Sequence, residues 1–206
     1  RVYSKPQCFF ICLSLSSGYY QTGLGKVSLN LSAARRSIMG GIAFFIGIDI
    51  QVKRRCPYAV LDSRGNPVES GWSNDSNEFV KVADRLANGD RTRIAFGIDA
   101  PRKPLESKRE WYWEGRKGKW RKFCETDGGN GRHCEVVIAA HRLANPQWTP
   151  CNESSPDWMK FGFRLYSDLH YFPHVYETFP SASYRILNSD PPIKLTMCLK
   201  DFAEGP

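Results

Sequence analysis

The chain has 206 residues, of which 41% are hydrophobic and 24% are charged, and its net charge is +8. These values are typical of one globular domain that can bury a substantial core. A positive net charge is typical of nucleic-acid-binding proteins, but here residues 1–38 alone carry +5 of it. No apolar stretch approaches the roughly 20 residues that a helix needs to span a bilayer, so the sequence excludes an integral membrane protein.

The first segment in chain order, residues 1–38, differs from the rest. It contains five basic and no acidic residues, lacks a clear periodicity, and is followed by Met39-Gly40-Gly41 and a strong apolar run. We expect residues 1–38 to be upstream translation or a disordered extension, and the domain to span residues 39–206. A targeting segment is the alternative, because basic residues precede the apolar residues 8–15.

Three strands are predicted next, at residues 44–49, 56–62 and 67–72. Each is a short run rich in apolar and β-branched or aromatic residues. A Ser-Arg-Gly-Asn turn joins the second run to the third. A tight turn that contains Gly favours a β-meander.

A helix and a fourth strand follow the meander. Residues 78–88 place apolar side chains on one helical face, and Ser76 or Asn77 could cap this helix. Residues 93–99 are an apolar run that predicts the fourth strand, and Pro101 ends it.

Residues 102–132 are a long, charged insertion that contains Gly. Within residues 102–122, nine basic residues outnumber three acidic ones, and aromatic residues lie among them. Neutralised phosphates combined with base stacking on aromatic rings are typical of proteins that bind single-stranded nucleic acid. We therefore predict nucleic-acid binding here, with a solvated loop as the alternative. The residues concerned are Trp111, Trp113, Arg116, Lys117, Lys119, Trp120, Arg121 and Lys122.

The last predicted elements are helices at residues 134–144 and 158–171, a fifth strand at 174–179 and a short helix at 180–187. A meander followed by a helix, a strand, helices and a strand implies an α/β domain with a mixed sheet. Residues 200–206 contain no closing helix, so we expect the domain to be truncated at the C-terminus.

The seven cysteines contain no CxxC pair. Their odd number and irregular spacing favour reduced thiols over a disulfide framework. Together with the lack of a membrane-spanning stretch, this leads us to expect a cytoplasmic protein.

Residues 45–49 and 95–99 both end on the triplet Gly-Ile-Asp at the end of a predicted strand. If the two strands are neighbours, Asp49 and Asp99 emerge at one end of the sheet, where open α/β sheets bind their ligands. Two carboxylates this close repel each other unless a proton or a divalent cation lies between them. The sequence therefore predicts a cation site there. The alternative is that each Asp caps the loop after its strand.

The order of these elements resembles the ribonuclease H-like fold. Four segments are similar to an uncharacterised family of predicted ribonuclease H-like nucleases: Phe-Ile-Gly-Ile-Asp at 45–49, Phe-Gly-Ile-Asp-Ala-Pro-Arg at 96–102, Arg-x-Cys-Glu at 132–135, and Val-Tyr-Glu-Thr-Phe-Pro-Ser-Ala at 175–182. The resemblance covers roughly residues 42–200. It implies a mixed sheet, made of a three-stranded meander plus parallel strands and flanked by helices.

The resemblance also implies a metal-dependent nuclease, which hydrolyses phosphodiester bonds with two Mg²⁺ or Mn²⁺ ions held by carboxylates. It assigns catalysis and metal binding to Asp49, Asp99 and Glu177, with Asp49 between the ions. Glu177 interrupts an apolar strand, so its carboxylate needs a metal, a cation or water. The alternative for Glu177 is a solvent-facing position on an edge strand. Family members usually carry another acid on a helix near the C-terminus, and none is visible before this chain ends.

Four more residues could line the same cleft. The resemblance suggests Arg132 and Glu135, although a Glu in the first turn of a helix is also what the helix dipole favours. Arg102 and Lys103 directly follow the fourth strand and could contact a phosphate. The alternative for this pair is a solvated loop.

Two other function classes stay open. Nucleotide-binding phosphotransferases of the sugar-kinase and actin type share this fold and also begin with Gly-Ile-Asp strands. They require a Gly-rich phosphate loop, whereas Ile-Gln-Val-Lys-Arg-Arg follows Asp49 here. A non-catalytic nucleic-acid-binding module with structural carboxylates is the other class. Cleavage that depends on Mg²⁺ would distinguish the nuclease from this module, and nucleotide binding would identify the phosphotransferase.

Overall fold

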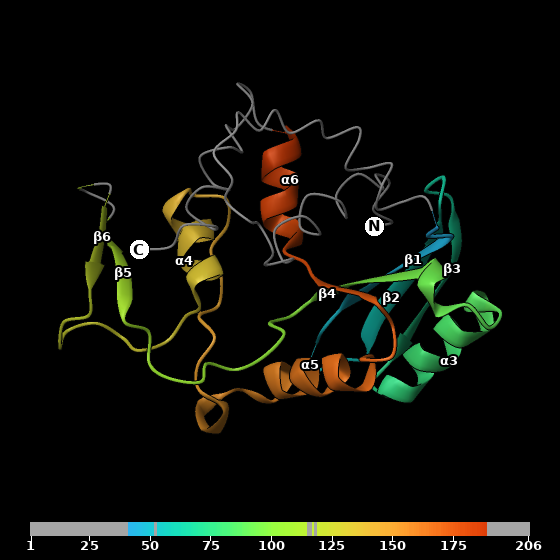
Figure 1. Ribbon diagram of the computed structural model, residues 1–206, viewed down its shortest axis with the longest axis horizontal. Helices are drawn as coiled ribbons and strands as arrows, with labels where there is room; N and C mark the ends of the chain where they lie inside the picture. Colours follow the sequence, from blue (N-terminus) through green and yellow to red (C-terminus); the bar gives the residue numbers. More distant parts are fainter. Residues whose placement is uncertain (1–40, 52, 115–116, 118, 189–206) are drawn as a thin grey trace, which may run out of the picture.

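The computed structural model describes residues 41–51, 53–114, 117 and 119–188. The expected extension at residues 1–38 lies outside the described residues, as do Arg116 and residues 189–206. In the described part, a five-stranded mixed sheet is flanked by helices, which confirms the α/β class (Figure 1). No helix within these ranges is long and apolar enough to cross a membrane.

Three antiparallel strands begin the sheet. β1 (Phe44–Asp49), β2 (Cys56–Asp62) and β3 (Pro67–Ser73) pair in chain order, as the meander prediction required. The Asp62 carboxylate holds the turn between β2 and β3 by accepting hydrogen bonds from two backbone N–H groups of the turn. Gly65 in this turn has a φ of 87°, which favours glycine.

Two parallel strands complete the sheet. β4 (Ile94–Asp99) and β7 (His174–Glu177) extend it in the order β3-β2-β1-β4-β7. β4 begins one residue later than predicted, because Arg91–Arg93 form a short 3-10 helix (η1) that is capped by the Asp90 side chain. β7 ends two residues earlier than predicted, and residues 178 and 179 form the short connection to the helix that begins at Pro180.

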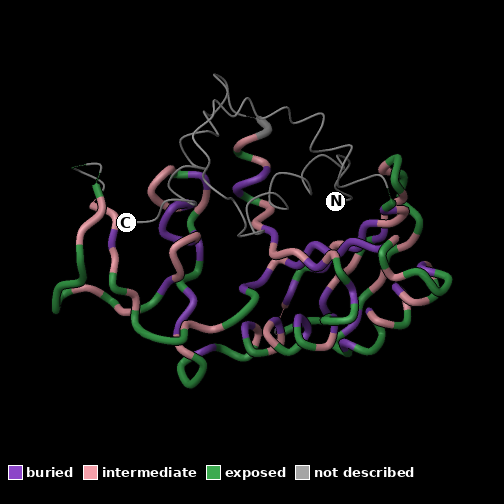
Figure 2. The backbone as a smooth tube through the Cα atoms, viewed as in Figure 1, coloured by how far each residue is buried: buried purple, intermediate pink, exposed green. Residues whose placement is uncertain are grey.

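Two helices cover one face of the sheet. α3 (Ser76–Ala87) and α5 (Asp157–Asp168) contact each other there (Figures 1 and 2). Both begin and end slightly before their predicted bounds. Phe79 of α3 and Leu165 of α5 are fully buried in the same cluster as Phe96 of β4. Burying a side chain of this size stabilises the fold by about 1.5–3 kcal/mol, so this face forms the main core.

The cap of α3 differs from the prediction. Asp75, rather than Ser76 or Asn77, is the N-cap, and its carboxylate accepts a hydrogen bond from the Asn77 backbone N–H at 2.9 Å. Ser76 is buried instead. At the other end, Asn88 adopts a left-handed conformation with φ 48°, and Gly89 follows with φ 89°. These two residues end the helix at Ala87, one residue before its predicted end.

α4 (His133–Ala140) and α6 (Pro180–Asn188) share a second apolar cluster, which contains Ile138 and Ala182. α4 is shorter than predicted. It ends before Arg142, whose left-handed φ of 54° is incompatible with continuing the helix.

The charged insertion contains a hairpin that was not predicted. β5 (Trp111–Glu114) and β6 (Lys119–Lys122) pair in an antiparallel sheet of their own. In Figure 1 the hairpin lies beyond α4, at the opposite end of the molecule from β3. Many exposed charges in this short segment obscured the alternation that reveals a strand.

Candidate active site

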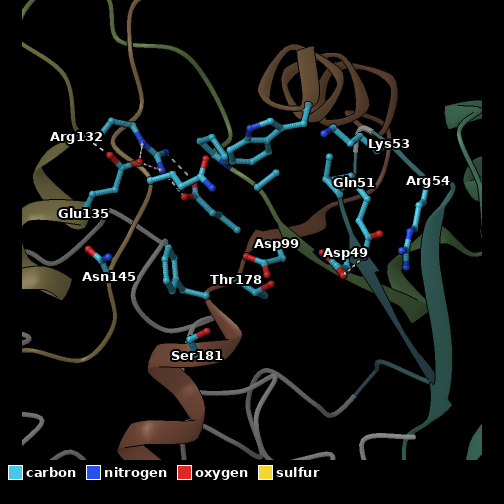
Figure 3. A pocket seen from close by; sticks show the side chains of 17 residues that line it. Asp49, Gln51, Lys53, Arg54, Asp99, Arg132, Glu135, Asn145, Thr178 and Ser181 are labelled. Carbon is cyan, nitrogen blue, oxygen red and sulfur yellow. Dashed lines mark hydrogen bonds and ion pairs between the residues drawn. The ribbon is translucent and has the colours of Figure 1, made fainter. Parts of the chain in front are cut away.

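The two Gly-Ile-Asp segments lie side by side. β1 and β4 are parallel, and Asp49 is directly opposite Asp99 in their register. Side chains at paired positions of neighbouring strands point to the same face, so the two carboxylates leave the sheet together at its carboxyl end. The prediction that these residues occupy adjacent strands is confirmed. Figure 3 shows both of them in one pocket.

Glu177 lies on the third parallel strand and lines the same cleft as Asp49 and Asp99. In the register of β7 and β4 it is level with Ile98, which belongs to the core under α3 and α5. Glu177 is therefore one position out of register with Asp99, but its charge still acts on Asp99. Among the described residues, no three His, Cys, Asp or Glu side chains are grouped so that they could hold a metal ion.

Arg132 provides the cation that Glu177 needs. Its Nη1 donates a hydrogen bond to Glu177 Oε2 at 2.8 Å, and its Nη2 donates to Oε1. The Arg102 backbone N–H also donates to Oε2, at 3.0 Å. The side chains of Arg132 and Glu177 are only 16% and 20% exposed, so this bidentate pair is largely removed from water. A guanidinium therefore neutralises Glu177 in this structure.

The same guanidinium binds Glu135, which is 3% exposed. The Glu135 carboxylate accepts hydrogen bonds from the Arg132 backbone N–H at 3.0 Å and the Thr149 backbone N–H at 2.9 Å. It also accepts one from the Thr149 hydroxyl. Glu135 therefore fixes Arg132 at the start of α4. Its first-turn position agrees with the helix-dipole alternative, and all of its oxygens are already used.

Asp99 lacks such partners. Among the described residues, no group donates a hydrogen bond to it or forms a salt bridge with it. Burial, together with the negative charges of Asp49 and Glu177, raises the pKa of Asp99 to about 7. Asp49 is exposed and accepts a hydrogen bond from Gln51 Nε2 at 2.8 Å. A cation between Asp49 and Asp99 would relieve the repulsion, and carboxylate oxygens fit Mg²⁺ or Mn²⁺.

The Asp pair opens into a cleft of about 560 Å³, a size typical of ligand sites. Figure 3 shows Arg132 on one side of it and Lys53 and Arg54 on the other. Lys53 and Arg54 are exposed, and neither forms a salt bridge with a described residue. They were not predicted as site residues. The available signal was the run Lys-Arg-Arg shortly after Asp49.

Arg102 and Lys103 follow Asp99 but do not line the cleft. The guanidinium of Arg102 lies 5.5 Å from the centre of the Tyr166 ring. Lys103 pairs with Glu106 at 2.5 Å, and both side chains are exposed. Phosphate contact by Arg102 and Lys103 stays a prediction that these positions do not favour.

Two of the basic residues predicted to bind nucleic acid are already paired. Arg121 forms a bidentate pair with Asp127 at 2.6 and 2.7 Å, and its hydrogen bonds hold the pKa of Asp127 well below its usual range. Lys117 pairs with Glu114 at 2.9 Å. The other described members of the predicted set are exposed or partly exposed: Trp111, Trp113, Lys119, Trp120 and Lys122.

Comparisons with protein-family models, with curated proteins and with solved structures found no match. The function therefore has to be argued from the site itself. Chemically, the cleft combines a pair of close carboxylates, which can bind a hard divalent cation, with cationic side chains on two sides, which can bind phosphate.

Proposed function

We propose that this protein is a metal-dependent nuclease, which hydrolyses phosphodiester bonds of nucleic acid with divalent cations held by carboxylates. The observation that carries the proposal is the in-register pair of Asp49 and Asp99, in which Asp99 has no hydrogen-bond donor among the described residues. A carboxylate so placed is fully charged at neutral pH only with a cation beside it.

The order of the strands supports a ribonuclease H-like fold as part of this proposal. An antiparallel meander is joined to two parallel strands in the order β3-β2-β1-β4-β7. This is the kind of mixed sheet that the sequence resemblance implies. The Asp pair lies at the carboxyl ends of β1 and β4, which is where open α/β sheets bind their ligands.

Asp49 and Asp99 would be the direct ligands of the first Mg²⁺ or Mn²⁺ ion. Glu177 would take part in holding a second ion only by exchanging Arg132 for it, because both of its oxygens accept hydrogen bonds from Arg132. When bound, a divalent ion polarises the phosphoryl group and lowers the pKa of the attacking water. Arg132 would meanwhile keep a positive charge beside the cleft, where negative charge develops on the phosphate.

The cations of the cleft support a polyanionic substrate. Lys53 and Arg54 line the side opposite Arg132, so positive charge lies on both sides of the Asp pair. The planar guanidinium of Arg54 can donate two hydrogen bonds to one phosphate, and Lys53 can act as a point charge. Neighbouring phosphates of one strand would therefore be held while the central one faces Asp49 and Asp99.

The test is Mn²⁺ binding and strand cleavage measured on Asp49→Asn and Asp99→Asn. The matched control is Asp157→Asn, which removes the same charge from an exposed position at the start of α5. We expect calorimetry to show a loss of Mn²⁺ affinity of more than about tenfold in both cleft variants, since even indirect partners of a metal change its affinity 10- to 100-fold. Cleavage of labelled DNA and RNA should be lost with it.

Cleavage that persists in EDTA would contradict the proposal. So would Mn²⁺ binding that is equal in Asp99→Asn and in the control. Nucleotide binding without strand cleavage would instead favour the phosphotransferase class.

A further inference from the structure

The β5–β6 hairpin presents aromatic rings on one face. Trp111 and Trp113 alternate with Tyr112 along β5, so the two indoles share a face while Tyr112 is buried on the other. Across the hairpin, Trp113 is directly opposite Trp120. The ring centres of this pair are 5.3 Å apart.

The row of rings continues from the hairpin to α4. The centre of the Trp120 ring lies 4.9 Å from that of His133, the first residue of α4. We call Trp111, Trp113, Trp120 and His133 the ring row. All four side chains are partly exposed.

The ring row leads to the cleft. His133 directly follows Arg132, which lines the cleft and holds Glu177. A chain that lies along the rings would therefore reach the Asp pair by passing Arg132. This continuity is a property of the fold, because the hairpin and α4 contact each other although they are separate in the sequence.

Positive charge accompanies the rings. Lys122 is opposite Trp111 across the hairpin, and its Nζ lies 5.8 Å from the centre of that ring. Lys119 is exposed at the other end of β6. Neither lysine forms a salt bridge within the described part of the chain, in contrast to Lys117. Both are therefore available to phosphates.

We propose that the ring row binds the unpaired bases of a single-stranded polynucleotide, with Lys119 and Lys122 at its phosphates, and directs the strand into the cleft. Aromatic rings stack on bases of any sequence, but a duplex hides the faces of its bases. The ring row therefore selects single strands rather than a sequence. The inference rests on the proposed function only in assigning the cleft as the destination of the strand.

The experiment measures binding apart from cleavage. Asp99→Asn chains in EDTA are titrated with short single-stranded DNA, single-stranded RNA and blunt duplex DNA, followed by fluorescence anisotropy and by quenching of tryptophan fluorescence. We expect single strands to bind more tightly than the duplex, and the two single-stranded arms show whether DNA or RNA is preferred. Trp113→Ala should weaken single-strand binding about tenfold, which is typical of the loss of one stacked base.

Trp72→Ala is the matched control. Trp72 is 58% exposed on β3, at the far end of the molecule from the hairpin, and its loss should leave binding unchanged (Figure 1). Trp113→Phe keeps a ring opposite Trp120 and should bind nearly as well as the unchanged chain. This variant, checked by thermal unfolding, decides the question if Trp113→Ala disrupts the hairpin.

The lysines are tested by salt dependence. Replacing Lys119 and Lys122 together with Gln should make the slope of log affinity against log salt shallower by about 1.4, since each phosphate contact on a single strand contributes about 0.7. Lys81→Gln on α3 removes an exposed lysine elsewhere and should leave the slope unchanged.

Duplex binding as tight as single-strand binding would overturn the inference. Unchanged affinity in a folded Trp113→Ala chain would overturn it too. So would a folded Trp113→Phe chain that binds single strands as weakly as Trp113→Ala does. A chain that binds single strands through these rings but cleaves none in Mn²⁺ would keep this inference and reject the proposed function.

Discussion

Two regions of the cleft contain carboxylates in opposite states. At the end of β7 and the start of α4, Glu177 and Glu135 share the guanidinium of Arg132, and every charge there has a partner. At the ends of β1 and β4, Asp49 and Asp99 face each other with no cation among the described side chains between them. The first region therefore has the character of a structural support, and the second that of a binding site.

Residue type alone does not decide whether a carboxylate stabilises the fold or is available to bind a ligand. Glu177 and Asp99 both end a parallel strand of the same sheet. The register of β7 turns Glu177 toward Arg132, whereas the register of β4 turns Asp99 toward Asp49. This role depends on the partner: Glu177 is paired with a buried guanidinium, whereas Asp99 has no donor among the described residues and stays available to a ligand.

We expect the largest loss of stability from a substitution in the region where Arg132 pairs with Glu135 and Glu177. Arg132→Met should lower the free energy of unfolding by about 3–5 kcal/mol, because it leaves Glu135 and Glu177 without a cation in a largely buried place. Urea unfolding measures this change. Arg85→Met is the control, since its pair with Glu69 is exposed, and it should cost much less. Equal losses in the two variants would mean that the Arg132 cluster has no special role.

The second largest effect should be a pH dependence of stability that arises from Asp99. The pKa of Asp99 is raised to about 7 from the ordinary 3.8, so between these values the folded chain holds a proton that the unfolded chain has lost. Stability should therefore fall as pH rises through this window, by about 1.4 kcal/mol per pH unit from this group.

Asp99→Asn should remove this decline, and so should saturating Mn²⁺ in the unchanged chain. Urea unfolding at pH 5 and pH 7 compares them, with Asp157→Asn as the control that keeps the decline. If the stability of Asp99→Asn falls with pH as steeply as that of the control, the pH dependence does not come from a raised pKa of Asp99.

A smaller loss of stability should follow from a substitution that displaces Asp99 indirectly, through its neighbour Ala100. Gly162 of α5 lies so close to Ala100 that an added Cβ would be 2.9 Å from the Ala100 side chain, and Ala100 directly follows Asp99. Gly162→Ala should cost about 1–3 kcal/mol by overpacking and should weaken Mn²⁺ binding by displacing Asp99. Gly128→Ala, in open space, should change neither. Unchanged Mn²⁺ affinity in a destabilised Gly162→Ala chain would show that α5 does not position Asp99.

The smallest effects on stability should come from the exposed lysines Lys53 and Lys103, which we expect to differ in nucleic-acid binding. Lys53→Gln and Lys103→Gln should both unfold like the unchanged chain. Only Lys53→Gln should weaken nucleic-acid binding and make its salt slope shallower, because Lys53 lines the cleft, whereas Lys103 is paired with Glu106 outside it. The reverse result would assign the phosphate contact to the loop after β4.

The sequence by itself determined the parts of this protein that depend on local pattern. The bounds of β1 and β2 follow from runs of apolar residues, and the repeated Gly-Ile-Asp triplet brought Asp49 and Asp99 to equivalent ends of two strands. Both conclusions need only the alternation of side chains along a strand and a parallel pairing of like segments.

The tertiary structure alone decided what each charged group meets. Arg132 reaches Glu177 across 45 positions of the chain, and Lys53 and Arg54 come to face it across the cleft only after the sheet has formed. The one-residue offset between the ends of β4 and β7 placed Glu177 against Arg132 rather than in register with the Asp pair, and no local pattern contains that offset. Charges act over a few ångströms of space, not of sequence, so their partners are set by register and packing.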